Sequence, residues 1–227
     1  PGASDQPIEY RVERVRDGRL FSSRTVDAVQ NDKLIWRTLV SCSVDDYGGV
    51  GHSRQRPCIS PPESALTIQQ IAESDGGLGE YWDGFSSVEV RIAEVSESDV
   101  TLRSAAPERH LWLRVTEDLS DDRALHQAAV AYVSDLMMIG ASVTPHGYTI
   151  GHENTLAKDW LAVSLDHSMW FHRHVRADEW ILFELSTPTA AKGRAAIESS
   201  VFDGDTQTSH EQAVHVVQEA FLRRTTH

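Results

Sequence analysis

One stretch of this chain has a clear helical pattern, and strand-like sequence lies on both sides of it. Residues 120–139 read SDDRALHQAAVAYVSDLMMI, with apolar side chains at steps of three and four that form one broad apolar stripe. Ser120 or Asp121 can cap its N-terminus, and Gly140 is placed to end it. A single long buried helix among many strands predicts an α+β fold in which an antiparallel sheet wraps the helix.

The strands are predicted from alternation of apolar and polar residues. Residues 8–44 contain three such runs, separated by Asp17-Gly18 and by residues 30–33, which indicates an antiparallel meander. The remaining strands are expected at 86–95, 110–117, 161–172, 179–187, 194–202 and 213–223.

The composition changes between these two groups of strands. Residues 45–85 are rich in Gly, Pro and Ser, with a short helix expected at 64–74. The chain therefore divides into a strand meander at 1–44, a connector at 45–85 and a larger unit at 86–227.

Charge and cysteine content limit the partners and the cellular location. The formal net charge is −13, which argues against a nucleic-acid partner because such binding depends on clustered Lys and Arg. Cys42 and Cys58 form neither a disulfide framework nor a zinc motif, and isolated thiols fit a reducing compartment. No apolar run approaches the ~20 residues of a membrane span. These observations predict a cytoplasmic protein.

Residues 164–174, SLDHSMWFHRH, contain several side chains that catalysis uses. A straight strand would place Ser164 on one face and His167 on the other, which disfavours a Ser-His-Asp nucleophile, and no G-x-S-x-G elbow is present. His172 and His174 could present two metal ligands, but no carboxylate follows at a ligand spacing, so no metal site is expected.

Two more polar residues lie near apolar stripes. Asp135 is flanked in the predicted helix by apolar residues, so it is either a paired or used carboxylate or an outward-facing one. Gln218 shares a strand face with Val214 and Val216 and needs hydrogen-bond partners if that face is buried. Spacing alone leaves both questions open.

Several segments together resemble the acyl-CoA thioesterase II family, the TesB-type double hot-dog enzymes. They are YRVERVRDGRLFSSRTVDAVQNDKLI after an initial PG, LHQAAVAYVSDLMMIG, SLDHSMWFHR, RADEW and VVQEAFLRR. The resemblance covers essentially the whole chain. It implies two fused units, each a long helix wrapped by an antiparallel sheet, that hydrolyse acyl-CoA to free acid and CoA without a cofactor and commonly assemble as homo-oligomers.

The resemblance also implies a site. Asp135, Ser164 and Gln218 match the family's water-activating aspartate, its Ser or Thr, and its glutamine. Further residues would line the substrate cleft or support it, and basic residues would contact the CoA phosphates unless they are ordinary surface charges. The first group is Asp166, His167, Trp170 and His172, and the second is Arg173, Arg176, Lys192 and Arg194.

Two departures keep alternatives open. The family's first unit carries a strand and a central helix before the PG motif, and this chain starts at PG, so the first unit is expected to lack both. His174 also stands where a proline is usual. A non-catalytic acyl-CoA-binding or assembly module is therefore an alternative, and a hot-dog thioester hydratase using Asp166 and His167 is another.

Overall fold

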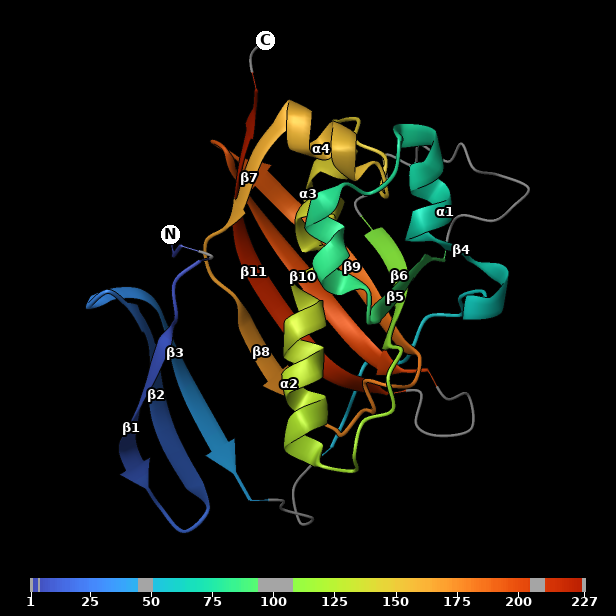
Figure 1. The fold of residues 1–227 in the computed structure, drawn as a ribbon. Coiled ribbons are helices and arrows are strands. Elements are labelled where there is room, and N and C mark those ends of the chain that lie inside the picture. Colours follow the sequence, from blue (N-terminus) through green and yellow to red (C-terminus); the bar gives the residue numbers. More distant parts are fainter. Residues whose placement is uncertain (1, 4, 45–50, 94–107, 205–210, 226–227) are drawn as a thin grey trace. The chain divides into compact units, whose positions relative to one another are not determined.

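The computed structural model describes residues 2–3, 5–44, 51–93, 108–204 and 211–225 (Figure 1). The chain divides into two compact units, Pro1–His52 and Ser53–His227, named here unit 1 and unit 2.

Unit 1 is a three-stranded antiparallel sheet. Its order is β1 (Glu9–Asp17), β2 (Phe21–Gln30) and β3 (Lys33–Ser43), which confirms the predicted meander. Asn31 and Asp32 connect β2 to β3 with φ values of 50° and 60°, as a tight hairpin turn requires. The described part of unit 1 contains no helix.

Unit 2 contains an eight-stranded sheet in the order β4-β5-β6-β9-β10-β11-β7, with β8 also pairing with β11. Every strand pair in it is antiparallel. The strands are β4 (Leu66–Thr67), β5 (Val88–Ile92), β6 (Glu108–Val115), β7 (Trp160–Ser164), β8 (Ser168–Phe171), β9 (Ile181–Ala191), β10 (Arg194–Asp203) and β11 (Gln212–Arg224).

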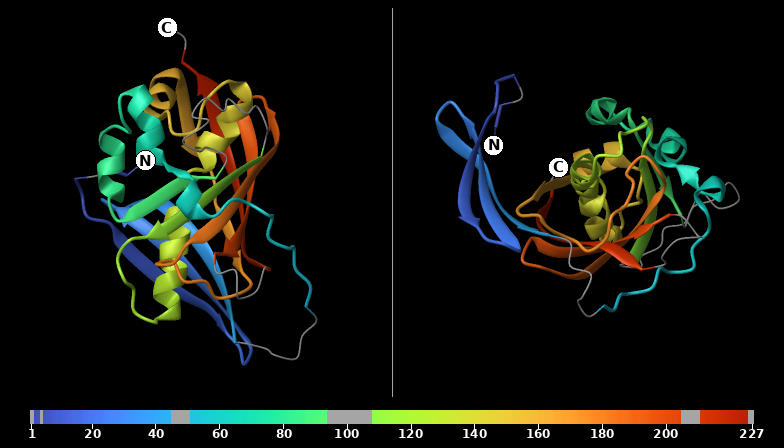
Figure 2. Two further views of the ribbon diagram at one scale, coloured as in Figure 1. Left: turned by 90° about the vertical axis from the view of Figure 1, so that its right-hand side faces the viewer. Right: turned by 90° about the horizontal axis from the view of Figure 1, so that it is seen from below.

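This sheet curves around the helices of unit 2 (Figure 2). The α-helices are α1 (Ile68–Ala72), α2 (Arg123–Ser134), α3 (Met138–Val143) and α4 (Glu153–Asp159). The described residues of this unit also form the 3-10 helices η1 (Pro62–Ser64), η2 (Glu73–Asp75), η3 (Glu80–Phe85) and η4 (Thr144–His146). The expected α+β arrangement, a helix wrapped by an antiparallel sheet, is present.

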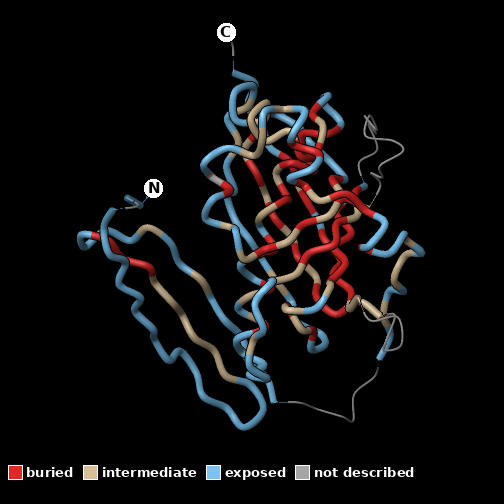
Figure 3. Tube along the Cα trace, turned by 45° about the vertical axis from the view of Figure 1, so that its right-hand side comes forward, coloured by how far each residue is buried: buried red, intermediate tan, exposed pale blue. Residues whose placement is uncertain are grey.

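The core lies between the sheet of unit 2 and its helices, where most buried residues gather (Figure 3). Val130 of α2, Val90 of β5 and Val216 of β11 are all fully buried. Burying each such side chain contributes roughly 1.5–3 kcal/mol, so packing rather than helix propensity holds α2 in place.

The central helix differs from the predicted one in both its start and its end. It begins after Asp122, whose side chain accepts a hydrogen bond from the Ala124 N–H, rather than after Ser120 or Asp121. It is interrupted after Ser134 and resumes as α3, so Gly140 lies inside a helix and does not end it. A Cβ at Gly140 would lie 3.4 Å from the Tyr148 ring, so close packing explains this glycine better than helix termination.

The helical run Arg123–His146 changes the expectation that no segment of the chain approaches the length of a membrane span. It has 24 residues, and its most apolar 18-residue window has a mean hydropathy of 1.3, which by length and composition is enough to cross a membrane. However, 56% of its most apolar window is buried inside unit 2. The core helix of a folded domain meets the same criterion, and burial against the sheet accounts for its apolar character.

The predicted connector is largely part of unit 2. Thr67 and Gln70 form a reciprocal capping box at the start of α1, and Ile68 and Ile71 of this helix are buried in the core. On the outer face of the sheet, Arg54 pairs with Glu184 at 2.8 Å. The compact units therefore divide near residue 52, and the segment from Ser53 onward packs with the larger unit.

Candidate active site

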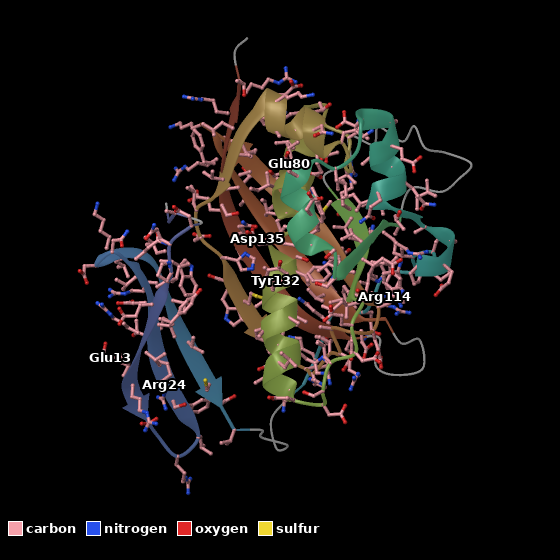
Figure 4. All side chains as sticks on the ribbon, in the orientation of Figure 1. Glu13, Arg24, Glu80, Arg114, Tyr132 and Asp135 are labelled. Carbon is pink, nitrogen blue, oxygen red and sulfur yellow. The ribbon has the colours of Figure 1, made fainter. Side chains whose placement is uncertain are left out.

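Asp135 stands at the end of α2, where the chain leaves the core. Val133 and Ser134 are buried, whereas Asp135 is the exposed C-cap residue, three positions beyond Tyr132 (Figure 4). The last carbonyls of a helix carry partial negative charge, so a carboxylate at this end is unfavourable unless donors hold it.

Two side chains from neighbouring strands supply those donors. Ser164 Oγ, at the end of β7, donates to Asp135 Oδ1 at 2.9 Å, and Gln218 Nε2, on β11, donates to the same oxygen at 2.5 Å. Gln218 is 1% exposed, which confirms that it faces the core with Val214 and Val216. The three residues matched by the family resemblance thus form one hydrogen-bonded group.

Gln218 and Asp135 each keep one oxygen acceptor that no described residue uses. Gln218 Oε1 is buried and has no hydrogen-bond partner in the described part of the chain. Among the described residues, Asp135 Oδ2 likewise makes no hydrogen bond, because both donors contact Oδ1. The arrangement can therefore accept hydrogen bonds from a further polar molecule.

The predicted straight strand at 161–172 is wrong, because a β-bulge divides it into β7 and β8. Ser164 pairs with Ala220 and Ser168 with Val217, so the β7–β8 side advances four positions while β11 advances three. One extra residue reverses the alternation of faces, as bulges do. His167 consequently lies on the same side of the sheet as Ser164, not on the opposite face.

The bulge residues have separate partners. His167 Nε2 lies 2.8 Å from Ser134 Oγ, and Asp166 Oδ1 accepts the Glu219 N–H at 2.8 Å. Removal of the imidazole from water lowers the pKa of His167, and the nearby charges of Asp135 and Asp166 partly oppose this effect. Asp166 and His167 are thus directed to different groups, which weakens the alternative of an Asp-His hydratase pair.

Three other residues predicted to contact substrate do not join this group. Trp170 pairs with His215 and lies beside its ring, on the sheet face opposite Gln218. Arg194 makes an ion pair with Glu219 at 3.3 Å, and His172 lies beyond the far end of β8. The motif at 164–174 includes Trp170 and His172, but a motif does not determine the sheet face on which a side chain lies.

The other basic candidates have protein partners or lie in a turn. Arg173 is paired with Glu211, and Arg176 contacts Asp121 at 2.7 Å. The Asp178 carboxylate, and after it that of Asp121, raise the pKa of Arg176 further above its usual range, so its charge serves local pairing. Lys192 occupies the β9–β10 turn with a φ of 52°.

Ser134 also belongs to the site through its contact with His167, and it was not predicted from the sequence. It is 2% exposed and also donates to the Ala131 carbonyl at 2.9 Å, as serines inside helices commonly do. Its position directly before Asp135 was the available signal.

In the described part of the chain, no group of three His, Cys, Asp or Glu residues is arranged to hold a metal ion.

Comparisons with known proteins agree with this geometry. Residues 88–221 match the family model described as acyl-CoA thioesterase, and residues 1–44 match the model of the acyl-CoA thioesterase N-terminal domain. The first match alone covers more than half of the chain and includes Asp135, Ser164 and Gln218.

Individual relatives extend the similarity across the chain. Human acyl-coenzyme A thioesterase 8 is 30% identical over 210 residues, covering 88% of this chain and 64% of the relative. Acyl-CoA thioesterase 2 of Haemophilus influenzae is 28% identical over 212 residues, covering 91% of this chain and 72% of the relative. This chain therefore spans a little under two thirds of the length of the human protein.

Solved structures support the same fold. Acyl-CoA thioesterase II TesB2 from Mycobacterium marinum superimposes with a TM-score of 0.76 at 30% identity, covering 99% of this chain and 77% of that one. A protein of Alicyclobacillus acidocaldarius described as having a hot dog fold gives a TM-score of 0.68 at 11% identity, covering 96% of this chain and 74% of its own, and supports the fold alone. The fold, the matched family model and these relatives together show that the chain belongs to the acyl-CoA thioesterase II family.

Proposed function

We propose that this protein hydrolyses acyl-CoA thioesters to a free fatty acid and CoA, with a water molecule as the nucleophile. The observation that carries the proposal is the convergence of Ser164 and Gln218 on one oxygen of the Asp135 carboxylate, which leaves its other oxygen without a partner. Membership of the acyl-CoA thioesterase II family and the names of the relatives support the substrate class.

Asp135 is the general base in this mechanism. A water that donates to Asp135 Oδ2 loses its proton to the carboxylate as its oxygen attacks the thioester carbonyl carbon. The tetrahedral intermediate then collapses with cleavage of the C–S bond, and CoA leaves as a thiolate, which is a good leaving group because thiols have pKa values near 8.5.

Ser164 and Gln218 fix the base and orient the water. Both donate to Asp135 Oδ1, so they hold the carboxylate in one orientation and reduce the entropic part of the barrier. The buried Gln218 Oε1 lacks a partner and can accept the second hydrogen of the water. The second N–H of the Gln218 amide is a candidate donor to the developing oxyanion.

Ser164 is not the nucleophile in this proposal. Its hydroxyl donates directly to a carboxylate, and the nearby His167 is directed to Ser134. Ser164 also lies at the end of a strand rather than on a strained elbow. No covalent acyl-enzyme is therefore expected.

The test is release of free CoA thiol from acyl-CoAs of short to long chain length. Asp135→Asn keeps the size of the side chain but removes the base, so kcat should fall by about 10²–10⁴. Asp118→Asn is the matched control, because Asp118 is exposed in a loop after β6. Binding of acyl-CoA without turnover by wild-type protein would instead identify a non-catalytic binding module.

We further propose that the protein is cytoplasmic and forms a homo-oligomer. Cys42 and Cys58 are free thiols on the surface, which suits a reducing compartment. Sedimentation velocity on the purified protein tests the second statement, and a purely monomeric species over a range of concentrations would contradict it.

A further inference from the structure

The β-bulge between β7 and β8 is fixed at three points. The Leu165 N–H donates to the Glu219 carbonyl at 2.8 Å, and the Glu219 N–H donates to Asp166 Oδ1 at 2.8 Å. These two bonds attach the bulge to β11. The third contact, between His167 and Ser134 at 2.8 Å, is the one among these that attaches it to α2.

The contact between His167 and Ser134 is consistent with a hydrogen on Nε2 of the imidazole. The single hydrogen of Ser134 Oγ has two other acceptors within reach, the Ala131 carbonyl at 2.9 Å and Met169 Sδ at 3.5 Å, so its oxygen can serve as an acceptor toward His167. The Ala131 and His167 contacts of Ser134 form together when His167 Nε2 carries a hydrogen. Ser134 is buried, so losing this donor would leave the contact without a replacement from bulk water.

Two adjacent helix residues therefore contact two residues of the bulged strand. Ser134 contacts His167, and Asp135 contacts Ser164. Ser164 lies three positions before His167 on the bulged strand. The helix ends at Ser134, and the Asp135 N–H reaches only the Val133 carbonyl, so helical hydrogen bonds constrain Asp135 weakly. Besides the Asp135–Ser164 bond itself, the His167–Ser134 contact at 2.8 Å and the longer contact of Ser134 Oγ with Met169 Sδ at 3.5 Å connect this helix end to the bulged strand.

We propose that His167 and Ser134 form a positioning pair that holds the end of α2 against the β-bulge, so that Asp135 and Ser164 meet in the geometry needed for water activation. This inference rests on the proposed function. His167 is a positioning residue here, because its Nε2 is engaged with Ser134 and not with the reacting atoms. It also replaces the expectation that His167 lines the substrate cleft.

Steady-state kinetics of CoA release in the full chain tests the proposal. His167→Ala and Ser134→Ala each remove the contact, and each should lower kcat by about 10- to 100-fold with little change in KM, since displacing a catalytic group by 1 Å costs about that much. The double variant should be no slower than the slower single variant, because both changes break the same interaction.

A conservative variant separates positioning from simple loss of packing. His167→Gln keeps an N–H donor in the region of Nε2 and should restore kcat to within about threefold of wild type, or about 0.7 kcal/mol. His215→Ala is the matched histidine control, because His215 lies on β11 but on the face opposite Gln218. Thermal unfolding identifies any variant that fails to fold, and Ser134→Ala remains informative if His167→Ala does so.

Several results would overturn the inference. Unchanged kcat in Ser134→Ala, or a kcat in folded His167→Gln as low as in His167→Ala, excludes positioning through this contact. A raised KM with unchanged kcat would assign His167 to substrate binding. Failure of the proposed function is distinct, because in that case wild-type protein would release no CoA and Asp135→Asn would change nothing.

Discussion

Unit 1 and unit 2 build their sheets from the same alternation of apolar and polar residues, yet unit 2 buries far more of its apolar side chains than unit 1 does. Val12 of β1 is 64% exposed and Leu39 of β3 is 72% exposed, whereas Val90 of β5 and Val216 of β11 are fully buried. The difference is a covering layer: α2 and α3 pack on the sheet of unit 2, and the described part of unit 1 has no helix. Alternation is enough to form strands, but a core requires a second layer.

The sharpest way to test this comparison is to remove a phenylalanine from each sheet. Phe183 of β9 is 2% exposed, and Phe21 of β2 is 60% exposed. Phe183→Ala should cost about 3–5 kcal/mol in the free energy of unfolding, because it leaves a cavity in the core. Phe21→Ala should change it by less than about 0.5 kcal/mol. Equilibrium denaturation of the full chain by urea measures both.

A large cost for Phe21→Ala would break the comparison. It would mean that the face of unit 1 that carries Phe21 and Leu39 is covered in solution, by another part of the protein or by a second copy. Repeating the measurement at several protein concentrations distinguishes these two sources, because only association with a second copy makes the cost depend on concentration.

The hairpin turns of the two units offer a second, smaller test. Asn31 in unit 1 and Lys192 in unit 2 both have left-handed φ values, 50° and 52°. Asn adopts this conformation more readily than Lys, because its short polar side chain can hydrogen-bond locally. Lys192→Asn should therefore stabilise the protein by about 0.5–1 kcal/mol, and Asn31→Lys should destabilise it by about the same amount.

The control for the turns is Lys33→Asn, which changes the same residue type at the first position of β3, outside the left-handed pair. It should give no gain in the melting temperature. If Lys192→Asn also gives none, the backbone of the β9–β10 turn relaxes in solution and the two turns are not equivalent.

The sequence predicted the layers of the fold well, because those depend on periodicity. The meander of unit 1, the central helix and the inward face of Gln218 all follow from the spacing of apolar residues. The convergence of Asp135, Ser164 and Gln218 was expected from a family resemblance, since no local pattern relates a helix end to two strands 29 and 83 residues away.

What could not be predicted depends on one inserted residue. The bulge at Leu165–His167 leaves the alternation of apolar residues almost unchanged, so a straight strand was the natural interpretation. It nevertheless reverses the face of every residue that follows in β8. This places His167 beside α2 and Trp170 on the opposite face, and it hides the role of Ser134 from any argument based on spacing.

Acidic residues extend the comparison between the units to electrostatics. In unit 1, the partly exposed Asp27 accepts hydrogen bonds from Arg37 at 2.6 Å, which lowers the pKa of Asp27. In unit 2, burial raises the pKa of Glu153, although a hydrogen bond from Tyr148 at 2.7 Å partly opposes the rise. One carboxylate is thus held in its charged form, and the other is pushed toward its neutral form.

These opposite shifts predict opposite effects of amide substitutions on the pH dependence of stability. Because the pKa of Glu153 is raised in the folded state, that state retains a proton that the unfolded chain loses as the pH rises above 4.5, and stability falls across that window. Glu153→Gln keeps the acceptor for Tyr148 without the charge, so it should raise the melting temperature at pH 7 and give no gain below pH 4.5.

Asp27→Asn should do the reverse, with a small loss at pH 7 that disappears as the pH falls below 3.8, the usual Asp value. Melting temperatures between pH 3.5 and pH 8 measure both. A gain from Glu153→Gln that is the same at every pH would show that packing at Tyr148, rather than the buried charge, limits the stability of unit 2.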